Sequence, residues 1–387
     1  MEASFSGAHR RWRRTTEGRR PVLPGWDGHS RARIQGGELP RVLMVCNLFT
    51  MPYRVMRCAH AAGSRVWALG NSGAQGLKYS RYCQQFFLAE TEFDGQLRDE
   101  AAEEINHHIR RLHIDLVLAG DAPSTRTLIG LRDAVSARCF PMPDLSCFDT
   151  LNNKWEFTGI CQRLGVRCPP TRLLPDRDAV LAEIQANRQR LPAMAKPLSL
   201  EGGHGVIKLT DGDVARQIRA IDYAPVLLQD FIPGEDIGAS VYCERGEILS
   251  FIAHKLARKI YSTFHSDEIQ DAVRRIMAYA RSDGVYNFDM RRTTGGDIYF
   301  LECNPRFFYK INLSMVAGIN FTQRGIRRGA DMPPDVPDGR RVRMPLAVAA
   351  DLHKPWTLSF HDIAMMTYLY ADPIPMIREW LRIDWED

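Results

Sequence analysis

Short apolar runs alternate with helical stretches in the first third of the chain. The apolar runs cover residues 41–48, 64–70, 86–89 and 115–120, and a helical pattern covers residues 95–112 before the last of them. Strands that alternate with helices form a parallel sheet whose two faces are covered by helices. The pattern therefore predicts a small doubly wound α/β domain over residues 39–145.

The carboxyl ends of these strands are the places where such a sheet binds ligands. Asn47, Gly70 and Asp121 fall there. Each of the three is equally typical of a turn, so none of them identifies a site alone.

Charge, hydropathy and cysteine content argue against a nucleic-acid-binding protein, a membrane protein and a disulfide-bonded protein. Residues 1–38 hold eight arginines and four acidic residues, so +4 of the net charge of +5 lies in this segment. The segment has no apolar periodicity and is predicted to be disordered, although a nucleic-acid or targeting role for it stays open. The remaining chain is close to neutral, which argues against nucleic-acid binding, and no apolar run approaches the roughly 20 residues that span a bilayer. The nine cysteines are scattered without a C-x-x-C pair, which is typical of reduced thiols in a cytoplasmic protein.

A predicted hairpin over residues 285–306 places two carboxylates opposite each other. Gly295-Gly296 is typical of the turn, with Asp289 on the first strand and Glu302 on the second. Like charges that face each other across strands are destabilising unless a cation lies between them. With Asn304 as a third oxygen ligand, the pattern predicts a Mg²⁺ site. A solvated salt bridge at a strand end is the alternative.

A glycine-rich loop follows an apolar strand that carries Lys196. The loop, residues 199–205, contains Gly202, Gly203 and Gly205, whose backbone can approach phosphates closely. It matches neither a Walker loop nor a dinucleotide fingerprint. By itself, a glycine-rich loop between two strands is usually just a turn. Upstream, residues 151–165 have the periodicity of one helix.

The order of these features resembles the ATP-grasp superfamily. Lys154 comes first, then Lys196 before the glycine-rich loop, then "LLQDFIPGED" (227–236), and finally the hairpin with Asp289 and Glu-x-Asn. The resemblance covers residues 150–320. Residues 41–145, with "YSRYC" (79–83), are similar to the small α/β domain that precedes the grasp fold in many members.

The resemblance implies a domain plan with an α/β fold of the α+β grasp type. The expected parts are a disordered tail at 1–38, a pre-ATP-grasp domain at 39–145, a lid subdomain with the glycine-rich loop at 146–230, a C-terminal subdomain with the Mg²⁺ site at 231–330, and an extension at 331–387. Trp356, Trp380 and Trp385 suggest that this extension packs on the core.

The resemblance also implies roles for individual residues. The expected ATP-binding residues are Lys154, Lys196, Gly202, Gly203, His204, Gly205, Gln229, Asp230, Ile232 and Asp236. Asp236, seven positions after Gln229, is preferred to Glu235 for the ribose hydroxyls. Mg²⁺ or Mn²⁺ is expected on Asp289, Glu302 and Asn304, and catalysis is expected from Lys196 and Arg306. The expected substrate residues are His254, Lys255, Arg258 and Tyr309.

Two positions depart from the family pattern. His204 stands where many members carry Lys or Ser, and Asn287 stands where D-alanine ligases carry an arginine. Arg306 is the natural substitute for that charge. The Asn-Pro-Arg motif therefore resembles the branch of carbamoyl-phosphate synthetase and carboxylase ATP-grasp domains.

The family chemistry implies an enzyme that activates a carboxylate as an acyl phosphate and joins it to an amine. Its cofactors would be ATP and Mg²⁺, and its partners would be small molecules rather than nucleic acid or a membrane, while a homodimer stays open. Two alternatives remain: another ATP-grasp phosphotransfer enzyme, such as a carboxylase-like enzyme or a kinase, and a nucleotide-binding module without turnover.

Overall fold

The computed structural model describes residues 39–186, 188–200, 202–327, 338–344, 347–348, 353–375 and 377. The predicted disordered tail at 1–38, and Trp380 and Trp385 of the C-terminal extension, lie outside these residues. All nine cysteines lie within them and are free thiols. No helix in the described part of the chain is long and apolar enough to cross a bilayer.

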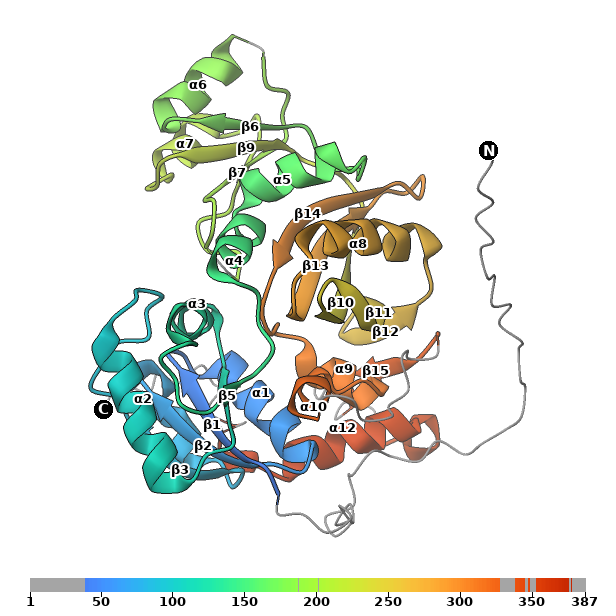
Figure 1. Cartoon of the computed structure of the whole chain (residues 1–387). Helices are drawn as coiled ribbons and strands as arrows, with labels where there is room; N and C mark the ends of the chain where they lie inside the picture. Colours follow the sequence, from blue (N-terminus) through green and yellow to red (C-terminus); the bar gives the residue numbers. More distant parts are fainter. Residues whose placement is uncertain are drawn as a thin grey trace, which may run out of the picture.

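The first sheet has five parallel strands in the order β3-β2-β1-β4-β5. Alternate residues of β1 face opposite sides: Val42 and Met44 pack in the core that contains α1, whereas Leu43 and Val45 pack against α2 and α3. This confirms the predicted parallel sheet with helices on both faces (Figure 1). Its elements are β1 (Arg41–Cys46), α1 (Thr50–Ala61), β2 (Arg65–Gly70), η1 (Ser72–Tyr79), β3 (Cys83–Leu88), α2 (Asp99–Leu112), β4 (Leu116–Ala119), α3 (Ala122–Leu131) and β5 (Arg138–Cys139).

Two helices connect this sheet to the rest of the molecule, α4 (Leu145–Asn152) and α5 (Lys154–Arg163). The sequence predicted one helix over 151–165, and the structure corrects this. Asn153 has extended backbone (ψ 115°), and its side chain accepts hydrogen bonds from the amides of Trp155 and Glu156. It therefore ends one helix and caps the next, which fixes where α5 begins.

The second sheet is antiparallel, with four strands in the order β6-β9-β7-β8. Val180 of α6 and Ile218 of α7 pack with its apolar residues in a small core of its own. Figure 1 shows this unit at the top of the molecule, with α6 and α7 beside its strands. Its elements are β6 (Thr171–Leu174), α6 (Arg177–Gln185), β7 (Ala193–Lys196), β8 (Ile207–Leu209), α7 (Val214–Arg219) and β9 (Val226–Asp230).

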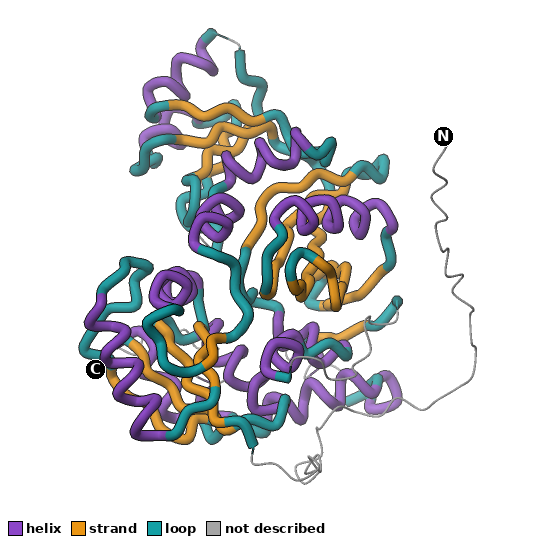
Figure 2. Tube along the Cα trace, viewed as in Figure 1, coloured by secondary structure: helices purple, strands orange, loops and turns teal. Residues whose placement is uncertain are grey.

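The third sheet has six antiparallel strands in the order β14-β13-β10-β11-β12-β15. One face packs on α5 and α8, while part of the other face joins the core of the N-terminal sheet together with α9, α10 and α12. Figure 2 shows the strands of this sheet enclosed by those helices. Its elements are β10 (Glu235–Glu244), β11 (Glu247–Ala257), β12 (Ile260–Phe264), α8 (Asp267–Ala280), β13 (Gly284–Arg292), β14 (Ile298–Asn304), α9 (Ile311–Ala317), α10 (Phe321–Ile326) and β15 (Arg341–Arg343).

The described part of the C-terminal extension contributes to the fold at two places. β15 adds an edge strand that the sequence did not predict. After η2 (Pro355–Thr357), α12 (Phe360–Tyr370) leads to Asp372, which accepts hydrogen bonds from the Ser80 hydroxyl (2.5 Å) and the Arg81 amide (3.1 Å). Trp356, by contrast, is 79% exposed.

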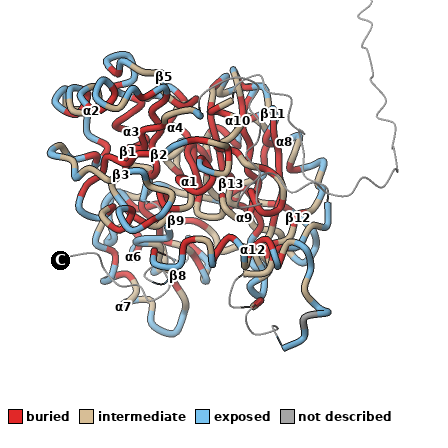
Figure 3. The backbone as a smooth tube through the Cα atoms, turned by 90° about the horizontal axis from the view of Figure 1, so that it is seen from below, coloured by how far each residue is buried: buried red, intermediate tan, exposed pale blue. Residues whose placement is uncertain are grey.

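Burial differs among the three sheets. In Figure 3, buried residues are concentrated in the strands and helices of the N-terminal and six-stranded sheets, whereas much of the region around α6 and α7 is exposed. The four-stranded sheet thus shares less of its surface with the body of the protein.

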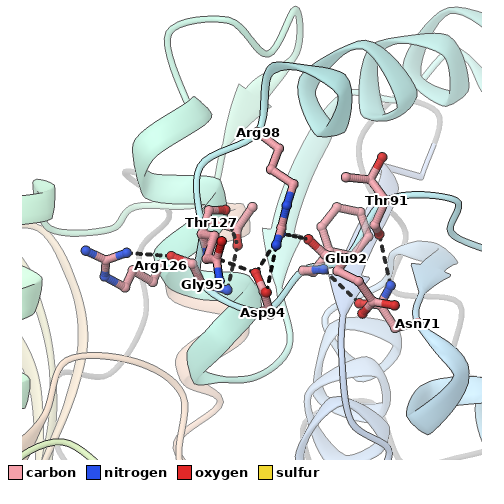
Figure 4. A network of polar contacts seen from close by, with 10 residues as sticks. Asn71, Thr91, Glu92, Asp94, Gly95, Arg98, Arg126 and Thr127 are labelled. Carbon is pink, nitrogen blue, oxygen red and sulfur yellow. Dashed lines mark hydrogen bonds and ion pairs between the residues drawn. The ribbon is translucent and has the colours of Figure 1, made fainter.

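Polar contacts order the loops at the carboxyl edge of the N-terminal sheet (Figure 4). The Asn71 side chain donates to the Thr91 carbonyl (2.9 Å) and accepts from the Phe93 amide (2.8 Å). The Gly95 amide donates to the Thr127 hydroxyl of α3 (3.1 Å). These bonds hold the β3–α2 loop against the end of β2 and against α3.

Asp121 is a structural residue of the same edge. Its buried carboxylate accepts from the amides of Asn47 (2.7 Å) and Leu48 (2.8 Å) after β1, and from the Ser124 amide (3.0 Å) in the first turn of α3. This agrees with the turn reading of Asp121.

Asp121→Ala should therefore lower the free energy of unfolding by about 3 kcal/mol, because it leaves buried backbone donors without an acceptor. Asp176→Ala is the matched control, since Asp176 is an exposed helix cap that accepts from the Ala179 amide (2.9 Å). Its loss should be about 1 kcal/mol. Urea denaturation measures both, and equal losses would contradict the structural role of Asp121.

Candidate functional site

The two predicted metal carboxylates lie directly opposite each other. β13 and β14 pair antiparallel, and the Cα partner of Asp289 is Glu302, which confirms the geometric prediction. Asn287 pairs with Asn304 in the next row of the same two strands. Because alternate residues of a strand share a face, these four side chains lie on one face of the six-stranded sheet.

Hydrogen bonds join this group to Arg306. The Asn304 side-chain amide donates to Asp289 Oδ2 (3.0 Å) and Glu302 Oε1 (3.3 Å). The guanidinium of Arg306, which is buried, donates to Asn304 Oδ1 (2.8 Å). Asn304 therefore links Arg306 to the carboxylates. Arg306 lies on the side of the site that faces the N-terminal sheet.

The electrostatics of the pair indicate a cation site. Burial, followed by the charge of Glu302, raises the pKa of Asp289 to about 6. Burial acts in the same direction on Glu302, but the ammonium of Lys154 and hydrogen bonds with Asp289 and Asn304 together outweigh it, so the pKa of Glu302 lies below its ordinary value. The site thus holds two acidic groups in a place where one of them resists ionisation unless positive charge is added.

Two lysines connect the four-stranded sheet and α5 to these carboxylates. Lys154 Nζ lies 3.1 Å from Glu302 Oε2 and donates to the carbonyl of Leu200 (3.0 Å) in the glycine-rich loop. Lys196, at the end of β7, donates to Gln229 Oε1 (2.7 Å). Burial, together with the charge of Lys154, lowers the pKa of Lys196 to about 8, although the charges of the two carboxylates act in the opposite direction.

The glycine-rich loop lies close to Tyr309, the residue that follows Asn-Pro-Arg-Phe-Phe. Gly202, Gly203 and Gly205 have φ values of 65°, 78° and 72°, which side-chain-bearing residues rarely adopt. A Cβ atom on Gly202 would lie 3.9 Å from the hydroxyl of Tyr309 and 3.3 Å from His204 Nδ1. The loop therefore brings its backbone and His204 over the edge of the site, while residue 201 lies outside the described residues.

Strand alternation at the start of β10 places Glu235 and Asp236 on opposite faces of the six-stranded sheet. Asp236 pairs with Arg291 (2.6 Å) on the same sheet face as Asp289, because 236 lies opposite 291 in the register. Glu235 points to the other face and binds Lys255 (3.2 Å) and Arg292. The preference for Asp236 over Glu235 is thus compatible with the geometry.

Other residues expected to bind the nucleotide lie along the same connection. Gln229 is buried and donates to the Thr171 hydroxyl (2.9 Å). Asp230 ends β9, and its carboxylate accepts from Gln189 (2.7 Å). Ile232 follows in the linker and is partly buried.

The four expected substrate residues divide into two pairs. His254 is buried on the site face of β11, and Tyr309 lies beside the glycine-rich loop. Lys255 alternates to the opposite face, where it binds Glu235, and Arg258 lies in the exposed β11–β12 turn. The structure therefore does not bring Lys255 and Arg258 to the carboxylate pair.

Sequence reasoning overlooked two residues of the site face and gave a third no function. Arg291 pairs with Asp236, and Ser240 donates to Asn287, which had been noted only as a departure from a family pattern. The signal that could have found Asn287 and Arg291 was strand alternation, since both lie two positions from Asp289. Ser240 is on another strand, and only the register shows its position.

The donor set fits a hard divalent cation. The two opposed carboxylates supply oxygen, the ligand type that Mg²⁺ and Mn²⁺ prefer. Asn304 would add its amide oxygen by turning its side chain, since its NH₂ group faces the carboxylates here and its oxygen faces Arg306. Within the described ranges, no group of three or more His, Cys, Asp or Glu side chains could hold a metal ion. The cation would therefore complete its coordination with phosphate oxygens and water, as is usual for Mg²⁺ bound together with a nucleotide.

Comparisons with known proteins bear on the fold of the chain. The family model "ATP-grasp in the biosynthetic pathway with Ter operon" matches residues 222–350. An N5-carboxyaminoimidazole synthetase from Staphylococcus aureus complexed with ADP superposes with a TM-score of 0.61 at 12% identity, over 83% of this chain and 87% of that one. The chain thus has the fold of ATP-grasp enzymes, and residues 222–350 match an ATP-grasp family model.

Two further ATP-grasp structures are similar. An L-amino acid ligase from Bacillus licheniformis has a TM-score of 0.57 and 16% identity, over 75% of this chain and 74% of that one. A biotin carboxylase from Campylobacter jejuni, complexed with an ATP analogue, has a TM-score of 0.57 and 15% identity, over 76% and 72%. No curated protein is significantly similar in sequence. At these identities, the solved structures show the ATP-grasp fold alone.

The Lys154–Glu302 pair gives a stability prediction. Lys154→Met should lower the free energy of unfolding by about 2–3 kcal/mol, less than for a fully buried pair, because the Glu302 side chain that it leaves unpaired beside Asp289 is 27% exposed. Adding Glu302→Gln should recover most of this loss. Urea denaturation of the two single variants and the double variant measures the coupling.

Lys255→Met is the matched control, because its ion pair has nearly the same length, 3.2 Å against 3.1 Å, but is more exposed. Its loss should stay below about 1 kcal/mol. If the double variant is as unstable as Lys154→Met, the ion pair is not the cause of the destabilisation.

Proposed function

We propose that this ATP-grasp protein is an ATP-dependent ligase that activates a carboxylate as an acyl phosphate and joins it to an amine, with release of ADP and phosphate. The observation that carries the proposal is the opposed pair Asp289 and Glu302, on the sheet face that meets Lys154 and Lys196. A site that combines paired oxygen ligands with two ammonium groups suits a nucleotide polyphosphate and its divalent cation.

In this proposal the nucleotide lies between the four-stranded and six-stranded sheets. Lys154, Lys196 and the glycine-rich loop contact phosphates, and Gln229 lies beside the adenine. The carbonyl of Asp230 and the amide of Ile232 bind the adenine edge, and Asp236 binds the ribose hydroxyls. Asp289, Glu302 and Asn304 hold Mg²⁺ or Mn²⁺, which when bound neutralises charge on the phosphates.

The protein's own residues then have to position the substrates and stabilise the developing charge, and none of them has to form a covalent bond to the substrate. A carboxylate oxygen of the substrate attacks the γ-phosphorus, and the bond to the ADP oxygen breaks. The amine next attacks the acyl carbon, phosphate leaves, and the amine proton passes to solvent or phosphate. Lys196 and Arg306 supply fixed positive charge where negative charge builds up during phosphoryl transfer.

The named relatives support a carboxylate-using reaction without deciding the acceptor. One is an L-amino acid ligase, and others are N5-carboxyaminoimidazole ribonucleotide synthetases and biotin carboxylases. The Asn-Pro-Arg motif favours a carboxylase-like reaction with bicarbonate as the second candidate. The description of the matching family model suggests a biosynthetic role, and the nine free thiols suit the cytoplasm.

The proposed function is tested by ADP release from pooled carboxylic acids, each with and without pooled amines. Hydroxylamine should trap the acyl phosphate as a hydroxamate when a carboxylate is present without an amine. Glu302→Gln should abolish both signals, because a neutral amide is a poor ligand for a hard cation. ADP release with bicarbonate alone would favour the carboxylase, and full activity of Glu302→Gln would contradict the metal site.

A second prediction concerns pH. Since the pKa of Lys196 lies at about 8, its ammonium is mostly protonated at pH 7 and mostly neutral at pH 9. Phosphate oxygens bind the protonated form, so affinity for ADP should be full below the pKa and should fall about tenfold by pH 9. Isothermal titration of ADP from pH 7 to pH 9 measures this slope.

Lys196→Met is the control for the pH dependence. It should bind ADP more weakly at pH 7 and show no fall between pH 7 and pH 9. A Lys196→Met profile as steep as that of the wild type would assign the titration to another group.

A further inference from the structure

A row of buried hydrogen bonds lies behind the carboxylate of Asp289. The Asn287 amide nitrogen donates to Asp289 Oδ1 (3.2 Å). The Ser240 hydroxyl donates to Asn287 Oδ1 (2.9 Å), and Ser240 Oγ lies 3.4 Å from His254 Nε2. Four residues from three strands thus form one continuous chain of contacts that ends at Asp289.

The chemistry of the groups fixes the direction of these bonds. A carboxylate accepts, so Asn287 must turn its NH₂ group to Asp289 and its oxygen to Ser240. That oxygen also only accepts, so the Ser240 proton points to it. Ser240 Oγ is then left to accept from His254, whose proton must be on Nε2. Every donor in the chain therefore points toward Asp289.

The register of the sheet explains how the chain crosses three strands. His254, Gly238 and Asp289 form one row, and Ser240 and Asn287 are directly paired in the next. Gly238 leaves room for the imidazole, since a Cβ atom there would lie 2.7 Å from His254 Cε1. The bonds therefore run diagonally between two rows of the site face.

His254 is held as a neutral ring. It stacks on Tyr261 with a centroid separation of 4.9 Å. Burial, followed by the charge of Lys310, lowers the pKa of His254 to about 3. A neutral imidazole with its proton on Nε2 is the form that the chain of bonds requires.

Packing alone does not account for these side chains. Ser240 and His254 are 0% exposed and Asn287 is 5% exposed, in a part of the sheet that apolar residues fill more favourably. His254 Nδ1 has no hydrogen-bond partner in the described part of the chain, and an unsatisfied buried acceptor costs about 1–3 kcal/mol. Polar groups that lower stability in this way indicate a role at the site they point to.

We propose that Asn287, oriented by Ser240 and His254, is a positioning residue that fixes the rotation of the Asp289 carboxylate for the divalent cation. The inference rests on the proposed function, because it takes Asp289 as a ligand. Without the bond from Asn287, Oδ1 loses this donor and the carboxylate keeps the bond from Asn304 to Oδ2. The rotation of the carboxylate about its Cβ–Cγ bond is then less restrained. Residues that orient metal ligands in this way typically change metal affinity by about 10–100-fold when mutated.

The test measures Mn²⁺ affinity by isothermal titration in the presence of a non-hydrolysable ATP analogue. Asn287→Leu keeps the volume but removes both hydrogen bonds, and it should weaken Mn²⁺ binding at least tenfold. Ser240→Ala should weaken it less, because Asn287 still contacts Asp289. Affinity for the analogue without metal should not change in either variant.

Ser250→Ala is the matched control. Ser250 is buried on the same face of β11, four positions from His254, and its hydroxyl has no partner among the described residues. It should leave Mn²⁺ affinity unchanged. Thermal melting checks the fold, and if Asn287→Leu does not fold, the comparison of Ser240→Ala with Ser250→Ala decides.

The outcomes separate the inference from the proposed function. Wild-type affinity for Mn²⁺ in Asn287→Leu and Ser240→Ala, or equal loss in Ser240→Ala and Ser250→Ala, overturns the positioning role alone. Absence of Mn²⁺ binding in the wild-type protein with the analogue overturns the metal site and the inference together.

Discussion

Two partly buried carboxylates that face each other are the constraint on which the rest of the site depends. Asp289 and Glu302 are direct cross-strand partners, and burial raises the pKa of Asp289 to about 6. Such a pair is unfavourable unless positive charge is near. Lys154 supplies part of that charge at 3.1 Å, and in our account a divalent cation supplies the rest.

The charged groups around this pair come from different elements of the fold. The six-stranded sheet carries the carboxylates, α5 carries Lys154, and β7 of the four-stranded sheet carries Lys196. Lys154 also bonds the Leu200 carbonyl in the glycine-rich loop, so one ammonium joins the loop to the carboxylates. Arg306 closes the site from the side of the N-terminal sheet, where it contacts Met51 of α1.

The sequence predicted what local patterns encode. The hairpin, its turn and the opposition of Asp289 and Glu302 follow from alternation and from a glycine pair, and the parallel sheet follows from the order of strands and helices. The sequence did not show which strands far apart in the chain pair with each other or in which register. Lys255 and Arg258 looked close to His254 along the chain, but alternation sends Lys255 to the other face and a turn exposes Arg258. The same limit hid Ser240, which reaches Asn287 only because β10 pairs with β13, and hid the edge strand β15.

The central claim is that Asp289 and Glu302 share a divalent cation with a nucleotide. It is tested most directly by a crystal structure of the protein with Mn²⁺ and a non-hydrolysable ATP analogue, with anomalous scattering used to locate the metal. We predict an anomalous peak between the two carboxylates, in contact with phosphate oxygens and with the side-chain oxygen of Asn304, whose amide turns toward the cation from the orientation that it has here. A nucleotide bound in the site with the Mn²⁺ peak elsewhere, or with Asp289 and Glu302 making no contact to it, would contradict the account.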